Sequence, residues 1–335
     1  MSVKEISQGV FLSGANLVSL LKTGKTGWIG CGVCLILLAG ISPVRALPDT
    51  TSGTELLRDP SFRQGFVLLR PEPGRKVECG VVRGSEGGEP VWQLAQWSSR
   101  YPFEATTSVT RGKGGASRLA TAARSVVFGD GVLSLAVNTA TEYGERPRRE
   151  EEPWVHLLVE QSIITQPCIG HLAALRLHCE ARRVRSELVH ADGYDPRLHA
   201  AQFLIFLSIQ NLEKESPGFG DYLWFGVPVY DNRHRTSSTY AAPDTAGSQK
   251  YIFTPGSDHY TSGSTHDEGW VTFDADLLPL IREGLATARK QGFLKGLEDD
   301  GRFRIAAINM GWEVPGTFDV EMRVRNFSLI AAARK

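Results

Sequence analysis

Three consecutive segments in the middle of the chain alternate apolar and polar residues with the two-residue period of β-strands, whose successive side chains point to opposite faces. The first is Trp154–Ser162 and the second is Leu175–Arg182, and both place polar residues on one side only. The third, Gln202–Gln210, is apolar on both sides at its centre, which is typical of a strand covered on both faces. We therefore expect Gln202–Gln210 in the middle of a sheet that carries a polar face.

Further strand-like segments are separated by turns that are rich in Pro and Gly, and the spacing favours a sandwich over a parallel α/β fold. They are Phe66–Leu69, Val77–Val82, Val91–Ala95, Ser125–Phe128, Leu133–Asn138, Phe303–Trp312 and Phe318–Leu329. One long helix is predicted between a cap at Asp274 or Asp276 and Gly292, because leucines recur there at helical spacing. The pattern predicts an all-β fold, an antiparallel β-sandwich (jelly roll) with one long helix near the C-terminal part.

The N-terminal segment has the order of a secretory signal peptide. Lys22 and Lys25 precede an apolar run, and Ala46 offers a small residue at the cleavage site. The run from 28 to 41 covers about fourteen residues, fewer than the roughly 20 that a spanning helix needs. We expect a signal peptide at 1–46, a linker at 47–54 and one sandwich domain at 55–335, in a secreted or periplasmic protein with no membrane span after cleavage.

Composition and charge exclude several classes of function. Lys and Arg number 37 and Asp and Glu number 37, so no net positive field attracts nucleic acid. Signal cleavage would leave Cys79, Cys168 and Cys179, which permit at most one disulfide, and no CxxC pair for structural zinc. We expect no cofactor and no metal site, although a structural calcium ion, the disulfide pairing and the oligomeric state stay open.

The segment from Ser216 to Asp231 combines aromatic residues, carboxylates and glycines. Sugar rings stack on aromatic side chains while planar polar groups bond their hydroxyls, so this mixture indicates a glycan site. The alternative is that Trp224 and Phe225 are simply core residues. The predicted substrate-binding residues are Asp221, Tyr222, Trp224, Asp231, Arg233, Trp312 and Glu321.

Polar residues on the predicted strand faces are the candidates for catalysis: Glu160, Glu180, His156 and His178. A glycosidase needs two carboxyl groups about 5–5.5 Å apart for retention of configuration or 6.5–9.5 Å apart for inversion, and cross-strand neighbours fall in this range. The alternative is a solvated face with cross-strand ion pairs among Glu160, Arg176, Glu180, Arg182, Glu321 and Arg323.

Two short motifs resemble known families. Leu56-Leu57-Arg58-Asp59-Pro60-Ser61-Phe62 resembles the opening of galactose-binding-like jelly rolls, which implies a fold similar to that of carbohydrate-binding modules. Arg185-Ser186-Glu187-Leu188 is similar to a strand motif of jelly-roll alginate lyases and implies that Arg185 neutralises a uronate carboxylate, although two other motifs of those lyases are absent.

The sequence therefore favours an exported, glycan-directed β-sandwich protein whose partner is a polysaccharide or oligosaccharide. Whether it only binds the glycan or also cleaves it stays open. One alternative is a polysaccharide lyase that acts on a uronate. Another is a non-catalytic structural or interaction module of the cell envelope.

Overall fold

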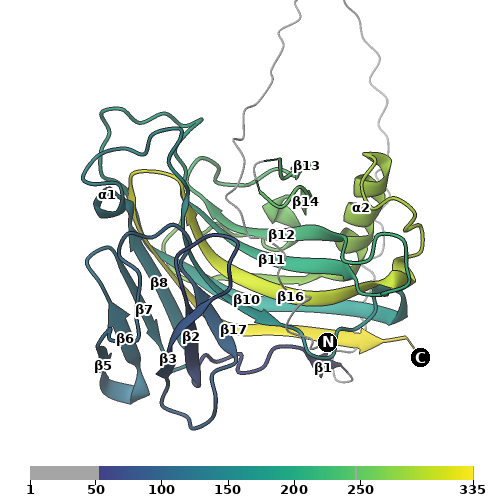
Figure 1. Cartoon of the computed structure of the whole chain (residues 1–335), viewed down its shortest axis with the longest axis horizontal. Coiled ribbons are helices and arrows are strands. Elements are labelled where there is room, and N and C mark those ends of the chain that lie inside the picture. Colours follow the sequence, from purple (N-terminus) through teal and green to yellow (C-terminus); the bar gives the residue numbers. More distant parts are fainter. Residues whose placement is uncertain (1–52, 246, 335) are drawn as a thin grey trace, which may run out of the picture.

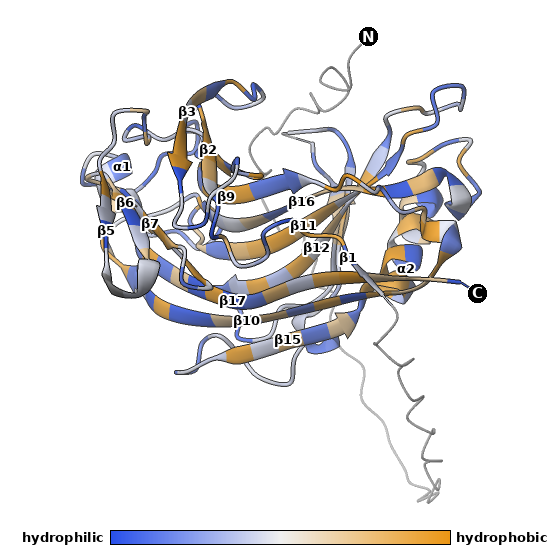
Figure 2. Ribbon diagram, turned by 90° about the horizontal axis from the view of Figure 1, so that it is seen from below, coloured by the Kyte–Doolittle hydropathy of each residue, from blue (hydrophilic) through white to orange (hydrophobic). Residues whose placement is uncertain are grey.

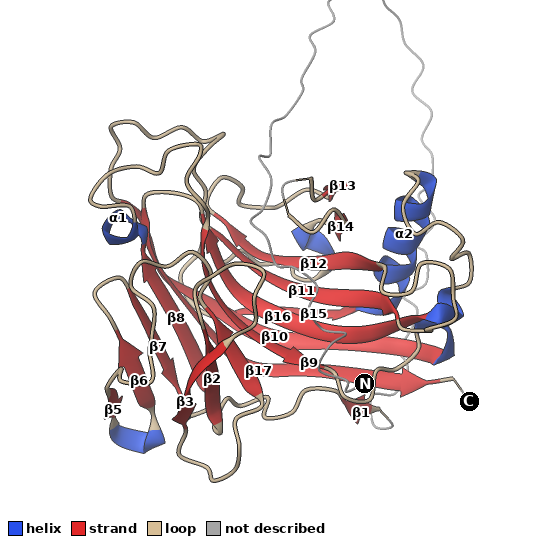
Figure 3. Ribbon diagram, in the orientation of Figure 1, coloured by secondary structure: helices blue, strands red, loops and turns tan. Residues whose placement is uncertain are grey.

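A computed structural model describes residues 53–245 and 247–334, and these residues form two β-sheets packed face to face (Figure 1). Within these described ranges strands dominate, and only one helix is long (Figure 3). The expected β-sandwich with one long helix in the C-terminal part is confirmed. The expected signal peptide at 1–46 lies outside the described residues and stays a prediction.

The first sheet, sheet A, has the strand order β15-β10-β17-β8-β7-β6-β5, with β1 paired to β17. Its strands are antiparallel to their neighbours. They are β1 (Thr54–Glu55), β5 (Val109–Arg111), β6 (Ser117–Ala120), β7 (Arg124–Phe128), β8 (Val132–Asn138), β10 (Leu172–Leu188), β15 (Val271–Asp276) and β17 (Phe318–Ala333).

The second sheet, sheet B, has the strand order β13-β14-β12-β11-β16-β9-β4-β2-β3. It is antiparallel except for the pairs β2–β4 and β12–β14. Its strands are β2 (Gly65–Leu69), β3 (Glu78–Arg83), β4 (Trp92–Ala95), β9 (Val155–Ser162), β11 (Gln202–Asn211), β12 (Tyr222–Asp231), β13 (Tyr240–Pro243), β14 (Tyr251–Thr254) and β16 (Phe303–Val314).

The long helix α2 (Leu277–Lys290) begins where the sequence predicted, because the Asp276 side chain accepts a hydrogen bond from the Leu278 N–H. It lies at one end of the sandwich (Figure 1). The short helix α1 (Thr139–Glu142) lies at the other end. The other helical turns in the part of the chain that the structure describes are 3₁₀: η3 (Lys113–Gly115), η4 (Ile169–His171), η5 (Ser257–His259) and η6 (Asp300–Arg302).

The core fills the space between the two layers, which Figure 2 shows as β16, β11 and β12 above β17, β10 and β15. The central strand β11 explains how sheet B contributes to it. Phe203, Ile205 and Leu207 are 0% exposed and belong to the core, whereas Leu204 and Phe206 point to the opposite face. The expectation of a central strand at Gln202–Gln210 is confirmed, with β12 and β16 as its neighbours.

One expectation about neighbours is wrong. The polar strands β9 and β10 follow each other in the sequence, and the sequence alone suggested that they share a surface. In the structure β9 belongs to sheet B and β10 to sheet A, because residues 163–171 carry the chain from one layer to the other. The polar faces of these two strands therefore lie on opposite sides of the sandwich.

Candidate functional site

The site lies on the face of sheet B that points away from the core, which we call the outer face. Backbone pairing sets its side chains in rows across the strands. One row runs from His156 on β9 through Glu313 on β16 and Gln202 on β11 to Asp231 on β12. Neighbouring strands lie about 4.8 Å apart, so these four polar side chains form a continuous band.

A pocket of about 250 Å³ opens above this band. Its floor comes from β11, β12, β14 and β16, and its wall from the chain that connects β12 to β13. It combines aromatic, aliphatic and polar groups, as small-molecule sites commonly do. The lining residues are Trp154, Gln202, Leu204, Phe206, Pro228, Tyr230, Asp231, Arg233, His234, Ser237, Ser238, Thr239, Tyr240, Asp244, Ile252, Thr254 and Glu313.

Two glycines shape this floor. A Cβ on Gly226 would come within 2.8 Å of the Phe206 ring and 2.3 Å of the Thr254 hydroxyl oxygen, so the lack of a side chain lets both groups reach the pocket. Gly311 has a φ of +153°, and a Cβ there would lie 2.2 Å from the Leu157 carbonyl oxygen. Glycine at 311 therefore lets β16 continue past β9 and present Glu313 two residues later.

Glu313 is the most perturbed carboxyl group of the pocket. Burial raises its pKa to about 7, and the negative charge of Asp244 contributes in the same direction. Within the part of the chain that the structure describes, no hydrogen bond contributes to this shift. Near neutral pH the group is therefore divided between its acid and its carboxylate form, which suits proton transfer.

Glu313 has uncharged neighbours on both adjacent strands. On β9 it pairs with His156, whose pKa is lowered to about 4 by burial and by the positive charge of Arg124, so the ring is neutral. The His156 Nδ1 lies 3.0 Å from the Trp154 carbonyl oxygen, which can only accept, so Nδ1 carries the proton. On β11 the neighbour is the amide Gln202, which donates a hydrogen bond of 2.7 Å to Asp231.

The second carboxyl group of interest is that of Asp244, which follows β13 and has one oxygen that can still accept a hydrogen bond. It is 6% exposed. One carboxylate oxygen accepts hydrogen bonds from the backbone N–H and hydroxyl of Ser248, at 2.7 and 2.8 Å, and the other, Oδ1, has no partner among the described residues. A buried oxygen without a partner is costly unless a ligand or water completes it. Asp244 thus has an acceptor available for a bound molecule.

Asp231 and Arg233 form a fixed pair at the same pocket. Arg233 donates through Nε and Nη2 to the two carboxylate oxygens, at 2.9 and 2.7 Å. Burial opposes the charge of Asp231, but the hydrogen bonds and charge of Arg233 prevail and lower the pKa of the carboxyl group. Both residues were expected in a binding site and both line the pocket. Their mutual bonds suit them to orienting a ligand rather than to proton transfer.

Trp224 and Tyr222 lie on the same outer face but are covered. Trp224 is 8% exposed, stands edge-on to Phe206 at a centroid distance of 5.8 Å, and donates from Nε1 to the Ser248 hydroxyl. Tyr222 is 7% exposed and packs edge-on against Trp224. Lys250, which forms an ion pair with Asp221, lies 5.5 Å from the Tyr222 ring centroid. The two rings that were expected to stack on a sugar are therefore largely covered, by Ser248 and Lys250.

The part of the outer face over β4 and β9 is closed. Glu160, expected as a catalytic residue, is 3% exposed and forms an ion pair of 2.7 Å with Lys76 from the loop between β2 and β3. Beside it, Trp97 and Leu158 are 2% and 4% exposed and form a small cluster separate from the core between the sheets. Glu160, which was expected to be catalytic, thus lies on the same face as Glu313 but forms an ion pair with Lys76.

Other expected site residues lie elsewhere. Trp312 is 0% exposed in the core, where its Nε1 donates to the Leu135 carbonyl oxygen, so its assignment to substrate binding is wrong. Glu180, His178 and Glu321 are on sheet A, far from the pocket in the fold. They pair there with Arg325, Asp274 and Arg185 respectively. The alternative of a face with cross-strand ion pairs describes this part of sheet A correctly.

The arginine of the lyase-like motif is also neutralised. Arg185 forms ion pairs with Asp319 at 2.8 Å and with Glu321 at 3.1 Å on sheet A. Two carboxylates already compensate its charge, so the structure offers no argument for a uronate at this position.

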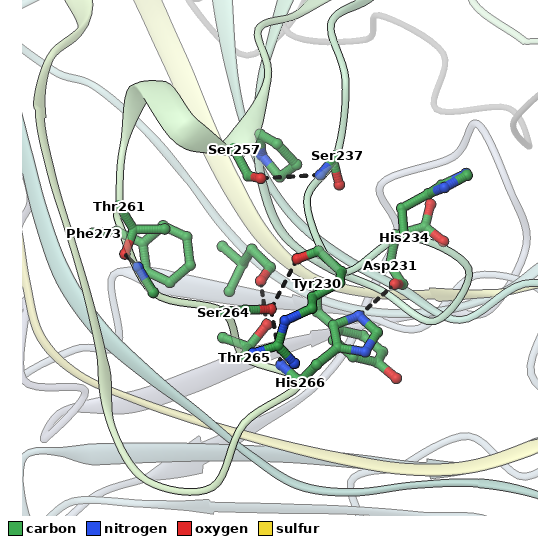
Figure 4. Close-up of a pocket in the computed structure, with 14 residues that line it drawn as sticks. Tyr230, Asp231, His234, Ser237, Ser257, Thr261, Ser264, Thr265, His266 and Phe273 are labelled. Atoms are coloured by element: carbon green, nitrogen blue, oxygen red, sulfur yellow. Dashed lines mark hydrogen bonds between the residues drawn. The ribbon is translucent and has the colours of Figure 1, made fainter.

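A second, smaller cavity adjoins the pocket and shares Asp231 with its lining (Figure 4). Its volume of about 10 Å³ suffices for one water molecule. Its polar groups bond mostly to one another: Thr265 donates to the Val229 carbonyl oxygen at 2.6 Å, and Ser257 accepts from the Ser237 N–H at 3.0 Å. We assign this cavity a structural role that anchors the wall of the larger pocket.

No cluster of three or more His, Cys, Asp or Glu side chains with a metal-binding arrangement occurs within residues 53–245 and 247–334. Over the same residues, none of the helices has the length and apolar character required to span a bilayer.

The sequence missed Glu313 and Asp244. The predicted strand Phe303–Trp312 ends one residue before Glu313, whereas β16 continues to Val314. The signal was present, because the alternation of Ile308, Met310 and Trp312 extends to Val314 and sets Glu313 on the opposite face. For Asp244 the sequence holds no comparable signal, since its role depends on a turn that folds back over the sheet.

Comparison with known proteins found no matching family model and no matching curated protein. Solved structures with a similar arrangement include Cel12A endoglucanase from Rhodothermus marinus, with 8% identity, a TM-score of 0.37, and coverage of 68% of this chain and 97% of that chain. A metagenome-derived glycoside hydrolase family 12 endoglucanase has 12% identity, a TM-score of 0.38, and coverage of 74% and 100%. The family 11 xylanase from Neocallimastix patriciarum has 11% identity, a TM-score of 0.34, and coverage of 72% and 100%. Likeness at this level assigns no family, so function has to be argued from the site.

Proposed function

We propose that the chain binds a glycan in the pocket on the outer face of sheet B and hydrolyses it, with Glu313 as general acid. The observation that carries the proposal is the raised pKa of Glu313, about 7, in a pocket lined by aromatic and hydroxyl-bearing side chains. A carboxylic acid that is still protonated near neutral pH can donate a proton to a leaving oxygen, and aromatic and hydroxyl groups suit sugar binding.

Asp244 is the proposed general base. In this scheme Asp244 takes a proton from a water molecule, the water oxygen bonds to the anomeric carbon, and the glycosidic C–O bond breaks as Glu313 protonates the leaving oxygen. The residues that flank Glu313 on the neighbouring strands are His156 and Gln202, neither of which is a carboxyl group. Because the water in this scheme attacks the anomeric carbon directly, we expect inversion of configuration and no covalent intermediate.

The experiment is hydrolysis of a panel of polysaccharides and oligosaccharides, measured by the release of reducing ends. We expect Glu313→Gln to lower the rate by a factor of about 10²–10⁴, the usual contribution of general acid catalysis, while binding by calorimetry persists. Glu180→Gln is the matched control, because it removes a carboxylate from the polar face of the other sheet. Unchanged hydrolysis by Glu313→Gln would refute the catalytic role, and absence of binding to any glycan would refute the whole proposal.

A further inference from the structure

The pocket is closed toward β9 and β4. In register along the outer face, Phe206 on the pocket floor is followed by Asn309 on β16 and Glu160 on β9. Asn309 is 5% exposed, and Glu160 lies under Lys76. The loop that carries Lys76 is also held to the segment that follows β4, through a hydrogen bond of 2.7 Å from the Ser98 N–H to the Pro71 carbonyl oxygen. A polymer that crossed the sheet from β14 to β4 would have to displace this loop.

The pocket is also closed along the strands, on the side of Trp224. Ser248, between β13 and β14, lies against this ring, and its hydroxyl bridges Trp224 and Asp244. Lys250 from the same turn reaches Asp221 at the start of β12, at 2.7 Å. Ser248 and Lys250 are thus fixed by bonds to Trp224 beside the pocket floor and to Asp221 at the start of β12.

The remaining side is the mouth. There the lining residues His234, Ser238 and Thr239 are exposed, while Trp154 and Arg233 are partly buried. The volume of about 250 Å³ is below the roughly 300–1,000 Å³ of typical ligand pockets. The pocket therefore has room for a short ligand that enters from one side.

We infer that the pocket takes the end of a glycan chain and not an internal stretch of it, because the loop with Lys76 and the residues Ser248 and Lys250 close two of its sides. This inference rests on the proposed function, since it names the part of the glycan that the same site binds. A chain end enters through the mouth past Trp154, and Glu313 and Asp244 meet the first linkage inside.

The test is calorimetric titration of the Glu313→Gln protein with a series of chains of one linkage and rising length, taken from the panel member that binds. We expect the dissociation constant, expressed as molar concentration of chain ends, to stay within about twofold from the shortest binding oligosaccharide to the polymer. Borohydride reduction of the chains shows which end is bound, since it opens only the reducing-end ring. A dissociation constant that falls in proportion to chain length would overturn the inference while leaving the proposed function standing. Absence of binding by every member would overturn both.

A loop variant gives a second readout. Arg70 and Val77 are joined by a backbone hydrogen bond of 2.8 Å, so residues 71–76 can be replaced by Asn-Gly as a two-residue hairpin turn. Glu160→Gln is combined with it to avoid an unpaired buried charge, and Glu160→Gln alone is the matched control. We expect the short-loop protein to bind internal segments, so that its dissociation constant per chain falls with chain length, whereas the control behaves as the parent does. Identical behaviour of both variants, with a cooperative melt, would contradict the role of the loop.

Discussion

Two glutamates on one face of sheet B have opposite environments. Glu160 and Glu313 lie on the neighbouring strands β9 and β16, four residues apart in register, which is about 13 Å. Glu160 has Lys76 at 2.7 Å, whereas Glu313 sits in an open pocket with a pKa raised to about 7. A cation supplied by one loop makes the first carboxylate structural. Among the described residues no cation pairs with the second, and we propose that this one transfers a proton.

The same contrast separates the covered and the open parts of this face. The covered part contains Trp97, Leu158 and Glu160, and the open part contains Glu313 and Gln202. Trp224 on β12 lies beside the pocket floor, on the side away from β9 and β4, and Ser248 covers it. Substitutions in the covered part should therefore lower stability, and substitutions in the open part should lower activity. The size of each effect tests to which part a residue belongs.

The largest expected effect on stability is that of Trp224→Ala. Since the ring is 8% exposed and its N–H is bonded, its loss should lower the free energy of unfolding by about 3–5 kcal/mol. Denaturant unfolding measures this value, and Trp224→Phe should cost much less because it keeps most of the packing. A Trp224→Ala protein with an unchanged midpoint and lost glycan binding would instead place Trp224 in the open part.

Lys76→Ala should follow with a loss of about 3 kcal/mol in the free energy of unfolding. This substitution leaves the carboxylate of Glu160 buried without its counter-charge. The loss of stability stays near the lower end of the usual range because Lys76 is partly exposed. The double variant Lys76→Ala/Glu160→Gln should recover much of the loss. If the double variant is as unstable as the single one, the loop and not the ion pair carries the stability.

Features of the fold and of the site could be predicted from the sequence where they depend on residues that are close together in the chain. Alternation predicted most of the strands, including β11 at the centre, and the cap at Asp276 predicted the start of α2. The assignment of strands to sheets is not local, because β9 and β10 show the same alternation and yet lie in different layers. The site depends on such long-range information: a loop at Lys76 decides the role of Glu160, and a turn near Asp244 decides the exposure of Trp224.

The pH dependence of stability should distinguish Glu313 from an ordinary carboxyl group. Its pKa is about 7 in the folded protein against 4.5 ordinarily, so the folded state holds the proton more tightly. Stability should therefore fall as pH rises from about 4.5 to 7, by at most about 3 kcal/mol. Glu313→Gln should lack this fall. The buried His156 opposes folding at low pH in both proteins, so the difference between their unfolding free energies at each pH isolates Glu313. Parallel curves for the two proteins would contradict the raised pKa.

The smallest expected effect is that of Glu180→Gln, which removes a carboxylate from the polar face of sheet A. Arg325 donates two hydrogen bonds to it, at 2.9 and 2.6 Å, and lowers its pKa together with Asn326. The pair is partly exposed, since 38% of the arginine side chain and 19% of the glutamate side chain are accessible. Water and salt screen such a pair, so we expect a loss within about 1 kcal/mol and no change in hydrolysis. A larger loss, or any loss of activity, would mean that the polar face of sheet A takes part in function, and the contrast between Glu160 and Glu313 would no longer account for the site.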